Sequence, residues 1–135
     1  MSRLREHDER GSAVVDFVLV MVLLVPLVLG VMQLALVLHV RNTVALAASE
    51  GARHAAAWES TPSDGLVRTR DQWTGAVAER FVKATRIEVT DFAGTPAYRV
   101  EVDVAVPALG LGGPAVAFTV AGNAVIEPDP SGAVP

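Results

Sequence analysis

Hydrophobic residues concentrate in one segment near the N-terminus. No charged residue occurs between Phe17 and Leu38, and this run is interrupted only by one proline, one glycine and one glutamine. About 20 apolar residues suffice to cross a bilayer core as a helix. A buried helix of a soluble domain would show a polar stripe, which this segment lacks. The pattern therefore predicts a membrane-spanning helix over residues 12–40.

Beyond this segment the pattern indicates two further helical stretches. Alanine, the best helix former, dominates Val40–Trp58 and predicts a helical stalk extension over residues 41–60. Thr61–Asp64 then breaks the chain and supplies a cap. Apolar residues at helical spacing predict an amphipathic helix over Gly65–Thr85, with Glu79–Lys83 as a favourable charge pair. Its apolar positions are Leu66, Trp73, Val77, Phe81 and Ala84, of which the two aromatic residues are expected core anchors.

The hydrophobic period then changes to two, which predicts strands. A first strand around Ile87–Thr90 is followed by a turn at Asp91–Pro96. Tyr98, Val100, Val102, Val104 and Val106 alternate with polar residues in the clearest strand. The loop Pro107–Pro114 leads to a third strand, in which Gly122 is expected to form a bulge or bend. We predict an α+β fold with a three-stranded antiparallel sheet, an extracytoplasmic domain over 61–127 and a disordered tail over 128–135.

Composition and charge narrow the class of protein. Of the 135 residues 51% are hydrophobic and 19% charged, whereas soluble domains average about 25% charged. The net charge of −4 argues against a general nucleic-acid binder. The chain has no cysteine, which excludes disulfides, thiolate metal sites and cysteine nucleophiles.

The residues that flank the apolar segment predict its orientation. Residues 1–11 carry Arg3, Arg5 and Arg10, whereas the other side opens with Arg41 and then Arg53. Lys and Arg close to a span favour the cytoplasmic side, and acidic residues count little. The N-terminus is therefore expected in the cytoplasm and the C-terminal part outside.

Two features inside the apolar segment have a functional and a structural interpretation. A carboxylate such as Asp16 is energetically costly inside a membrane, so Asp16 is a functional candidate. The alternative interpretation is that Asp16 lies at headgroup depth, where the dipole at the helix N-terminus favours an acid. Pro26 removes a helical hydrogen bond and, with Gly30, predicts a kink or local melting. That kink is either a flexible joint or the irregularity that membrane helices commonly tolerate.

Gly11, followed by an apolar helix with an acid at its fifth position, resembles the class III prepilin-peptidase site of type IV pilins. The wider segment of residues 10–57 resembles the TadE-like pseudopilins of tight-adherence (Flp-type) pili, and the resemblance continues more weakly to Glu127. The shared features are the Gly11–Ser12 junction, Asp16 with Phe17, Pro26, and the alanine-rich run Ala45–Arg53. The chain departs from the family at Asp16, where the usual acid is glutamate and aspartate is one methylene shorter.

The resemblance implies a pilin-like minor pseudopilin that takes part in pilus assembly and adhesion. Residues 1–11 would be a leader, removed by prepilin peptidase between Gly11 and Ser12. The new amine of Ser12 would be at least partly cationic and lies four residues from Asp16, on one helix face. The implied partners are prepilin peptidase, other pilins and pseudopilins, the pilus assembly machinery and the lipid bilayer. The implied location is the bacterial cytoplasmic membrane, crossed once, with the cell-surface pilus as a further location.

The sequence contains little that indicates a catalytic or metal-binding site. Glu50 and His54 lie four apart, but two ligands do not make a metal site, and no phosphate-binding glycine motif occurs. We therefore expect no enzyme activity, no cofactor and no metal. Two other hypotheses remain: a single-pass anchor that presents a small interaction domain, and a secreted protein cleaved near Ala45–Ala47. The second is disfavoured because the apolar core exceeds the usual 7–15 residues of a signal.

Overall fold

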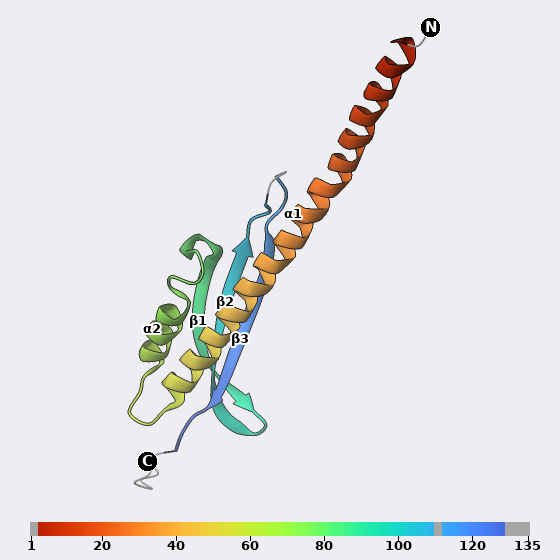
Figure 1. The fold of residues 1–135 in the computed structure, drawn as a ribbon. Coiled ribbons are helices and arrows are strands. Elements are labelled where there is room, and N and C mark those ends of the chain that lie inside the picture. The colour runs from red at the N-terminus through yellow and green to blue at the C-terminus, as the bar shows by residue number, and fades with distance from the viewer. Residues whose placement is uncertain (1–2, 110–111, 129–135) are drawn as a thin grey trace. The chain divides into compact units, whose positions relative to one another are not determined.

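The computed structural model describes the backbone of residues 3–109 and 112–128, with side chains from Gly11 onward. The elements along the chain are α1 (Arg3–Ala56), α2 (Pro62–Trp73), a 3₁₀ turn η1 (Glu79–Phe81), β1 (Val82–Phe92), β2 (Thr95–Val106) and β3 (Val116–Val125) (Figure 1). They confirm the predicted α+β class, with a long N-terminal helix, a short second helix and a three-stranded antiparallel sheet. The tail predicted over 128–135 lies outside the described residues except for Pro128.

The chain divides into two compact units. The N-terminal unit comprises residues 1–35, and the head unit comprises residues 36–135. In the N-terminal unit the only described element is the first part of α1. The segment expected as a stalk extension is helical through Ala56, and it belongs to the head unit, where its residues form part of the core.

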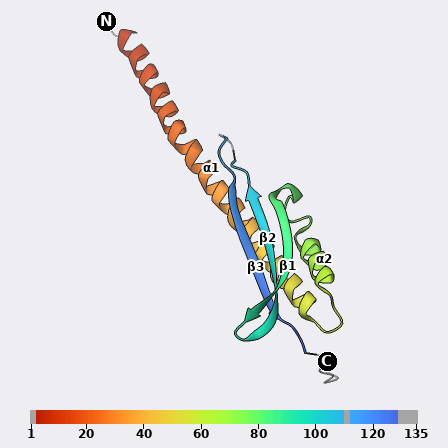
Figure 2. The same ribbon diagram turned by 180° about the vertical axis from the view of Figure 1, so that it is seen from behind.

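The sheet of the head unit is an antiparallel meander in the order β1-β2-β3 (Figure 2). The turn between β1 and β2 is narrower than the predicted Asp91–Pro96, because Phe92 and Thr95 still pair. Ala93 and Gly94 form it with φ values of 55° and 85°. A two-residue hairpin turn needs positive φ values at both positions to match the twist of the strands. The carboxylate of Asp91 accepts a hydrogen bond from the Gly94 N–H at 2.8 Å.

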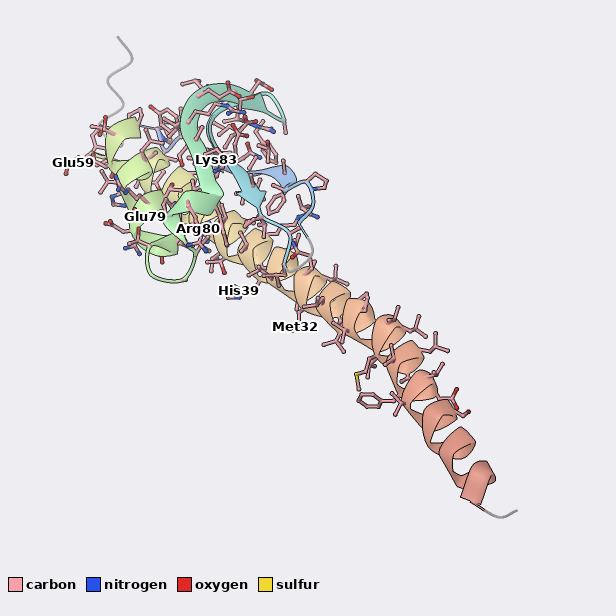
Figure 3. The ribbon with its side chains drawn as sticks, turned by 90° about the horizontal axis from the view of Figure 1, so that it is seen from above. Met32, His39, Glu59, Glu79, Arg80 and Lys83 are labelled. Atoms are coloured by element: carbon pink, nitrogen blue, oxygen red, sulfur yellow. The ribbon has the colours of Figure 1, made fainter. Side chains whose placement is uncertain are left out.

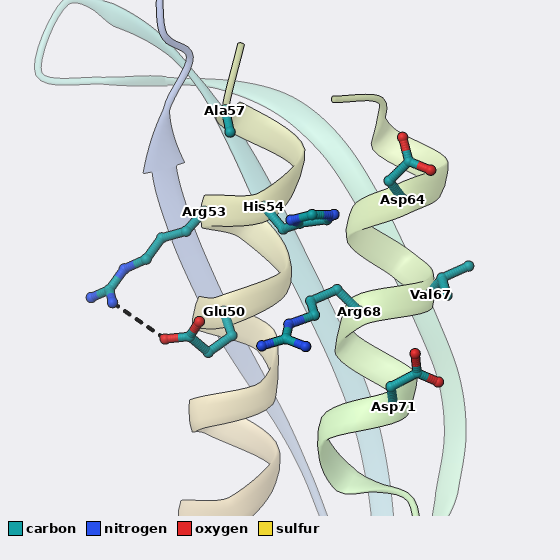
Figure 4. A pocket seen from close by; sticks show the side chains of 8 residues that line it. All are labelled: Glu50, Arg53, His54, Ala57, Asp64, Val67, Arg68 and Asp71. Carbon is teal, nitrogen blue, oxygen red and sulfur yellow. Dashed lines mark hydrogen bonds and ion pairs between the residues drawn. The ribbon is translucent and has the colours of Figure 1, made fainter. Parts of the chain in front are cut away.

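The predicted alternation in β2 is confirmed. Val100, Val102, Val104 and Val106 are buried on one face, and Arg99, Glu101 and Asp103 lie on the other. The buried face packs against the part of α1 in the head unit, where the fully buried residues are Val40, Val44, Ala47, Ala48 and Ala52. Strands pass behind both α1 and α2 in Figure 4, so both helices cover the same face of the sheet.

Gly122 does not form the predicted bulge. It pairs in regular register with Val100, and the irregularity in the sheet lies instead in β1 between Val82 and Ala84. A Cβ atom at Gly122 would lie 2.5 Å from Cα of Ser49. Glycine is therefore needed here because the backbone of α1 touches the backbone of β3.

A second close approach joins α1 to α2. A Cβ atom at Gly51 would lie 2.7 Å from the carbonyl oxygen of Gly65, and one at Gly65 would lie 2.7 Å from that of Gly51. Thr69 is fully buried at this crossing, and its hydroxyl donates to the Gly65 carbonyl at 2.8 Å. The two glycines thus let the helix backbones approach closely, and the Thr69 hydroxyl occupies the space that a side chain at Gly51 would need.

The predicted cap of α2 is confirmed, but the helix begins at Pro62 rather than at Gly65, and its predicted end is also wrong. Thr61 caps the helix: its hydroxyl accepts from the Asp64 N–H, while the Asp64 carboxylate accepts from the Thr61 N–H at 2.9 Å. This is a capping box, which satisfies two backbone donors at once. The helix ends at Trp73 rather than at Thr85, because Thr74 is extended and Gly75 has a φ of 86°.

The residues after α2 form a turn and then the edge strand β1. Trp73, Val77 and Phe81 are nevertheless buried in one core, so the expected core anchors are confirmed although no continuous helix carries them. The predicted Glu79–Lys83 pair is absent from the described contacts. Glu79 instead lies 3.8 Å from Arg70, and Lys83 donates to the carbonyl of Arg80 at 2.7 Å. Glu79, Arg80 and Lys83 are labelled together where β1 begins in Figure 3.

Candidate functional site

The first part of α1 exposes nearly all of its hydrophobic surface. Every residue from Gly11 to Val20 is exposed. Most large hydrophobic residues of this unit are exposed, from 42% at Leu24 to 76% at Leu23, whereas Met21 and Leu29 are half-buried. Monomeric soluble proteins rarely expose a continuous apolar surface of this extent. Among the described residues, α1 is long and apolar enough to cross a membrane.

The predicted processing junction lies inside a helix. The sequence suggests a helix that begins after Gly11, but α1 begins at Arg3 and continues through Gly11 and Ser12. Glycine weakens a helix interior by about 1 kcal/mol relative to alanine, so the junction is a weak point in an otherwise continuous helix. A Cβ atom at Gly11 would meet nothing within 4 Å, so packing within the described residues does not require this glycine.

Ser12 and Asp16 both lie in α1 and are both exposed. Residues four apart share one face of a helix, with Cβ atoms about 5–6 Å apart. In the intact chain the nitrogen of Ser12 is an uncharged amide. Only cleavage after Gly11 would create a cation there, so the pairing of Ser12 with Asp16 stays a prediction.

Pro26 and Gly30 lie within α1, which the structure assigns as helix on both sides of them. A Cβ atom at Gly30 would meet nothing within 4 Å. The local melting considered from the sequence is therefore not seen in the described helix. The kink itself stays a prediction.

The exposed face of the sheet carries a charged network. The guanidinium of Arg86 lies 2.6 Å from Glu101, and that of Arg99 donates to Glu101 at 2.7 Å. The hydroxyl of Thr119 donates to Asp103 at 2.6 Å, and Arg86 also pairs with this carboxylate. These contacts lower the pKa of Glu101, chiefly through Arg99, and that of Asp103, chiefly through Thr119. They raise the pKa of Arg86, chiefly through Asp103.

An open groove of about 640 Å³ lies between the end of α1 and α2 (Figure 4). Both Glu50 and His54, which the sequence raised as a weak metal pair, line it. Glu50 accepts from Arg53 at 3.4 Å. The lining mixes acidic and basic side chains, and the described residues contain no group of three or more possible metal ligands. The groove residues are Glu50, Arg53, His54, Ala57, Asp64, Val67, Arg68 and Asp71.

The arrangement defines a class of protein. A single apolar helix of membrane-spanning length continues into a small α+β unit, as expected for a single-pass membrane anchor. Residues 11–53, about a third of the chain, match the family model described as TadE-like protein. This is the family that the sequence resembles, and it points to a protein associated with Tad (Flp-type) pili. No curated protein and no solved structure matches the chain.

Proposed function

We propose that the chain is a minor pseudopilin of a tight-adherence (Flp-type) pilus system with a structural, non-catalytic role. The extent of the family match carries the proposal. It begins at Gly11, the predicted processing junction, and runs along α1 to residue 53. It thus includes both the exposed apolar part of the helix and the part that packs in the head unit. A plain anchor requires only about 20 apolar residues.

In this proposal residues 12–35 anchor the chain in the bacterial cytoplasmic membrane, because residues 36–40 of the predicted span belong to the head unit. The three arginines of the leader, Arg3, Arg5 and Arg10, place the N-terminus in the cytoplasm by the positive-inside rule. The head unit then lies outside, where other pilins, pseudopilins and the assembly machinery meet it.

Processing supplies the partner for the intramembrane acid. Prepilin peptidase cuts between Gly11 and Ser12, and the new amine neutralises Asp16 within the chain or on a neighbouring subunit. An unpaired aspartate costs about 2.5–3.5 kcal/mol at the centre of a span and less near its end. The pair reduces this cost and favours assembly of processed chains over unprocessed ones.

The structure argues against the secretion hypothesis. Ala45–Ala47 lies within α1, between the buried core residues Val44 and Ala48. Cleavage there would separate Val40 and Val44 from the core that they help to form. A signal peptidase site at this position would therefore dismantle the head unit.

The mature N-terminus tests the processing step. We expect co-expression with an active prepilin peptidase to yield a chain that starts at Ser12, measured by intact mass. Gly11→Leu should block cleavage. Gly30→Leu is the matched control, because a Cβ atom at either glycine meets nothing within 4 Å. A wild-type chain that still starts at Met1 would support the plain anchor, and a Ser12 start in Gly11→Leu would exclude the peptidase assignment.

A second variant tests the role of the acid. Asp16→Ala should be cleaved normally but incorporated poorly, so surface pili recovered by shearing should fall. Asp16→Glu is the control, because it keeps the charge and lengthens the side chain by one methylene. Normal piliation in Asp16→Ala would remove the pairing argument.

A further inference from the structure

The edge strand β1 carries charges that are arranged symmetrically about its centre. β1 lies at one edge of the sheet (Figures 1 and 2), and no strand among the described residues pairs with its outer side. Lys83 and Arg86 precede Ile87 by four residues and by one, and Asp91 and Glu88 follow it by four residues and by one. Each basic residue of β1 therefore has an acidic residue at the same distance on the other side of Ile87.

These charges are only partly neutralised within the head unit. Lys83, Glu88 and Asp91 are exposed and form no ion pair among the described residues. Arg86 is paired with two carboxylates of β2. Charged side chains on an edge strand normally prevent it from pairing with other strands. The charges of β1 therefore oppose most partner strands, but they favour a partner that presents the opposite charge at each position.

A second copy of β1 in antiparallel orientation is such a partner. Pairing about a two-fold axis at Ile87 sets Lys83 opposite Asp91, and Arg86 opposite Glu88, of the other copy. Opposite charges directly across two strands stabilise their pairing, and like charges destabilise it. A shift by two residues would set Arg86 opposite Arg86, or Glu88 opposite Glu88. A shift by one residue would turn the buried face of one strand to the solvent side of the other. The charge pattern therefore selects one register.

The same register brings an exposed valine to a groove beside β1. Val89 is 66% exposed, and it shares the face of β1 with Thr85 and Ile87, of which Ile87 packs against the core. A groove of about 380 Å³ lies between α2 and the start of β1. In the selected register Val89 of one copy lies opposite Thr85 of the other, which is a wall of this groove, so pairing would remove the valine from water. The groove residues are Leu66, Arg70, Trp73, Glu79, Val82, Lys83, Ala84 and Thr85.

We propose that the head unit forms a symmetric dimer by antiparallel pairing of β1 with β1 of a second copy. The pairing joins the two sheets into one and satisfies backbone groups at the outer edge of β1. Such a dimer is closed, because the same surface serves both copies. It goes beyond the proposed function, since it requires neither cleavage nor contacts with other pilus proteins. Because the two strands run in opposite directions, two chains anchored in one bilayer pair in this way only when the strands run along its surface.

The absence of native cysteine allows disulfide formation to report the register. Full-length chains with Thr85→Cys and with Val89→Cys, each carrying a different tag, are mixed in detergent and oxidised. The mixture should give a disulfide-linked heterodimer, because side chains directly opposite in an antiparallel pair have Cβ atoms about 4.5–5.5 Å apart. Each variant alone should give about fivefold less linked dimer, because its two cysteines are offset by about 13 Å of strand, which is too far for a disulfide.

Charge reversal tests the ion pairs between the copies. Lys83→Glu sets like charges opposite Asp91 at both symmetric positions, so it should raise the dimer dissociation constant about tenfold, measured by sedimentation equilibrium in density-matched detergent. Combining it with Asp91→Lys in the same chain should restore the constant to within about threefold of the wild-type value. Arg68→Glu is the matched control, because Arg68 is exposed and lines the other groove. Thermal unfolding of each variant shows whether the head unit is intact.

Three results would overturn the proposal, each in a different way. A monomer at every concentration, with no linked dimer in the mixture, excludes pairing through β1. Linkage of Val89→Cys alone that is as strong as linkage in the mixture excludes the register. If Lys83→Glu leaves the dissociation constant of a dimer unchanged, the copies meet at another surface, such as the exposed apolar part of α1, and β1 is not the contact.

Discussion

The two parts of α1 are both apolar, yet they serve opposite purposes. Residues 11–35 present large aliphatic side chains that remain exposed, whereas residues 36–56 carry mainly small side chains on the face that packs in the head unit. Large side chains maximise apolar contact with a fluid environment. Small side chains let a helix backbone approach a sheet or another helix. The size of apolar residues, rather than their hydropathy, therefore distinguishes the segment for lipid from the segment for protein.

Glycines make the contrast sharpest. Gly30, in the first part, has open space around it, whereas Gly51, in the second part, lies against the backbone of α2. On the sheet, Gly122 meets α1 in the same manner. Packing thus does not require glycine in the N-terminal unit, but it does require glycine in the head unit. Four predictions test the packing and charges of the head unit, and the first two compare it with the N-terminal unit.

The largest effect is expected at the contact between β3 and α1. Gly122→Val places side-chain atoms where the backbone of Ser49 lies, so it should lower the free energy of unfolding by about 4 kcal/mol or more. Gly30→Val should leave the unfolding of the head unit unchanged. Urea unfolding of the full chain in detergent, followed by Trp fluorescence, measures both. Equal stability of the two variants would refute the backbone contact.

A core valine should matter in only one part of the helix. Val44 is fully buried, and Val44→Ala should cost about 2 kcal/mol from lost burial plus the cavity left behind. Val20 is 57% exposed, and Val20→Ala should change head stability by less than about 0.5 kcal/mol. The same urea titration gives the comparison. A cost at Val20 as large as that at Val44 would show that the two units unfold together.

The helix crossing can be tested with two threonines that make the same bond. Thr69 donates to the carbonyl four residues earlier at 2.8 Å and is buried, whereas Thr74 does so at 2.7 Å and is exposed. Thr69→Val should cost about 1 kcal/mol, and Thr74→Val should cost less because water replaces its bond. Thermal unfolding monitored by circular dichroism separates the two. The crossing is not tightly packed if Thr74→Val proves the more damaging change.

The smallest effect concerns pH. Glu101 and Asp103 have lowered pKa values in the folded chain, so their contribution to stability is present above the unfolded pKa of about 4. It is lost as the pH falls through the lower folded values. The urea midpoint of the head unit should therefore decrease as the pH is lowered from 7 to 3. Glu101→Gln should flatten this dependence, and an unchanged slope would show that the network adds nothing to stability.

Much of the architecture follows from local patterns in the sequence. The apolar run, the alanine-rich continuation, the valine alternation in β2 and the Thr61–Asp64 cap all predicted elements that the structure contains. Trp73 and Phe81 were also predictable as core residues because burial follows hydrophobicity. The TadE-like resemblance rested on the first part of the chain, and the family match covers the same part.

The errors share one cause. Residues 74–85 have a helical period, yet they turn and form η1 and the start of β1. Hydrogen bonds to β2 satisfy the backbone from Val82 onward, and local propensity does not include that long-range partner. The bulge that the sequence predicts at Gly122 is wrong for the same reason, since the helix that Gly122 touches lies more than 70 residues earlier in the chain.

By itself the sequence determined the apolar segment, the elements of regular period, the caps and the candidate junction at Gly11–Ser12, because these depend on neighbouring residues along the chain. Only the tertiary structure decided that residues 36–56 form part of the head core and that Gly51 and Gly122 are contact points. These features depend on which distant segments meet. That is set by the packing of the whole head unit, so no local pattern could reveal it.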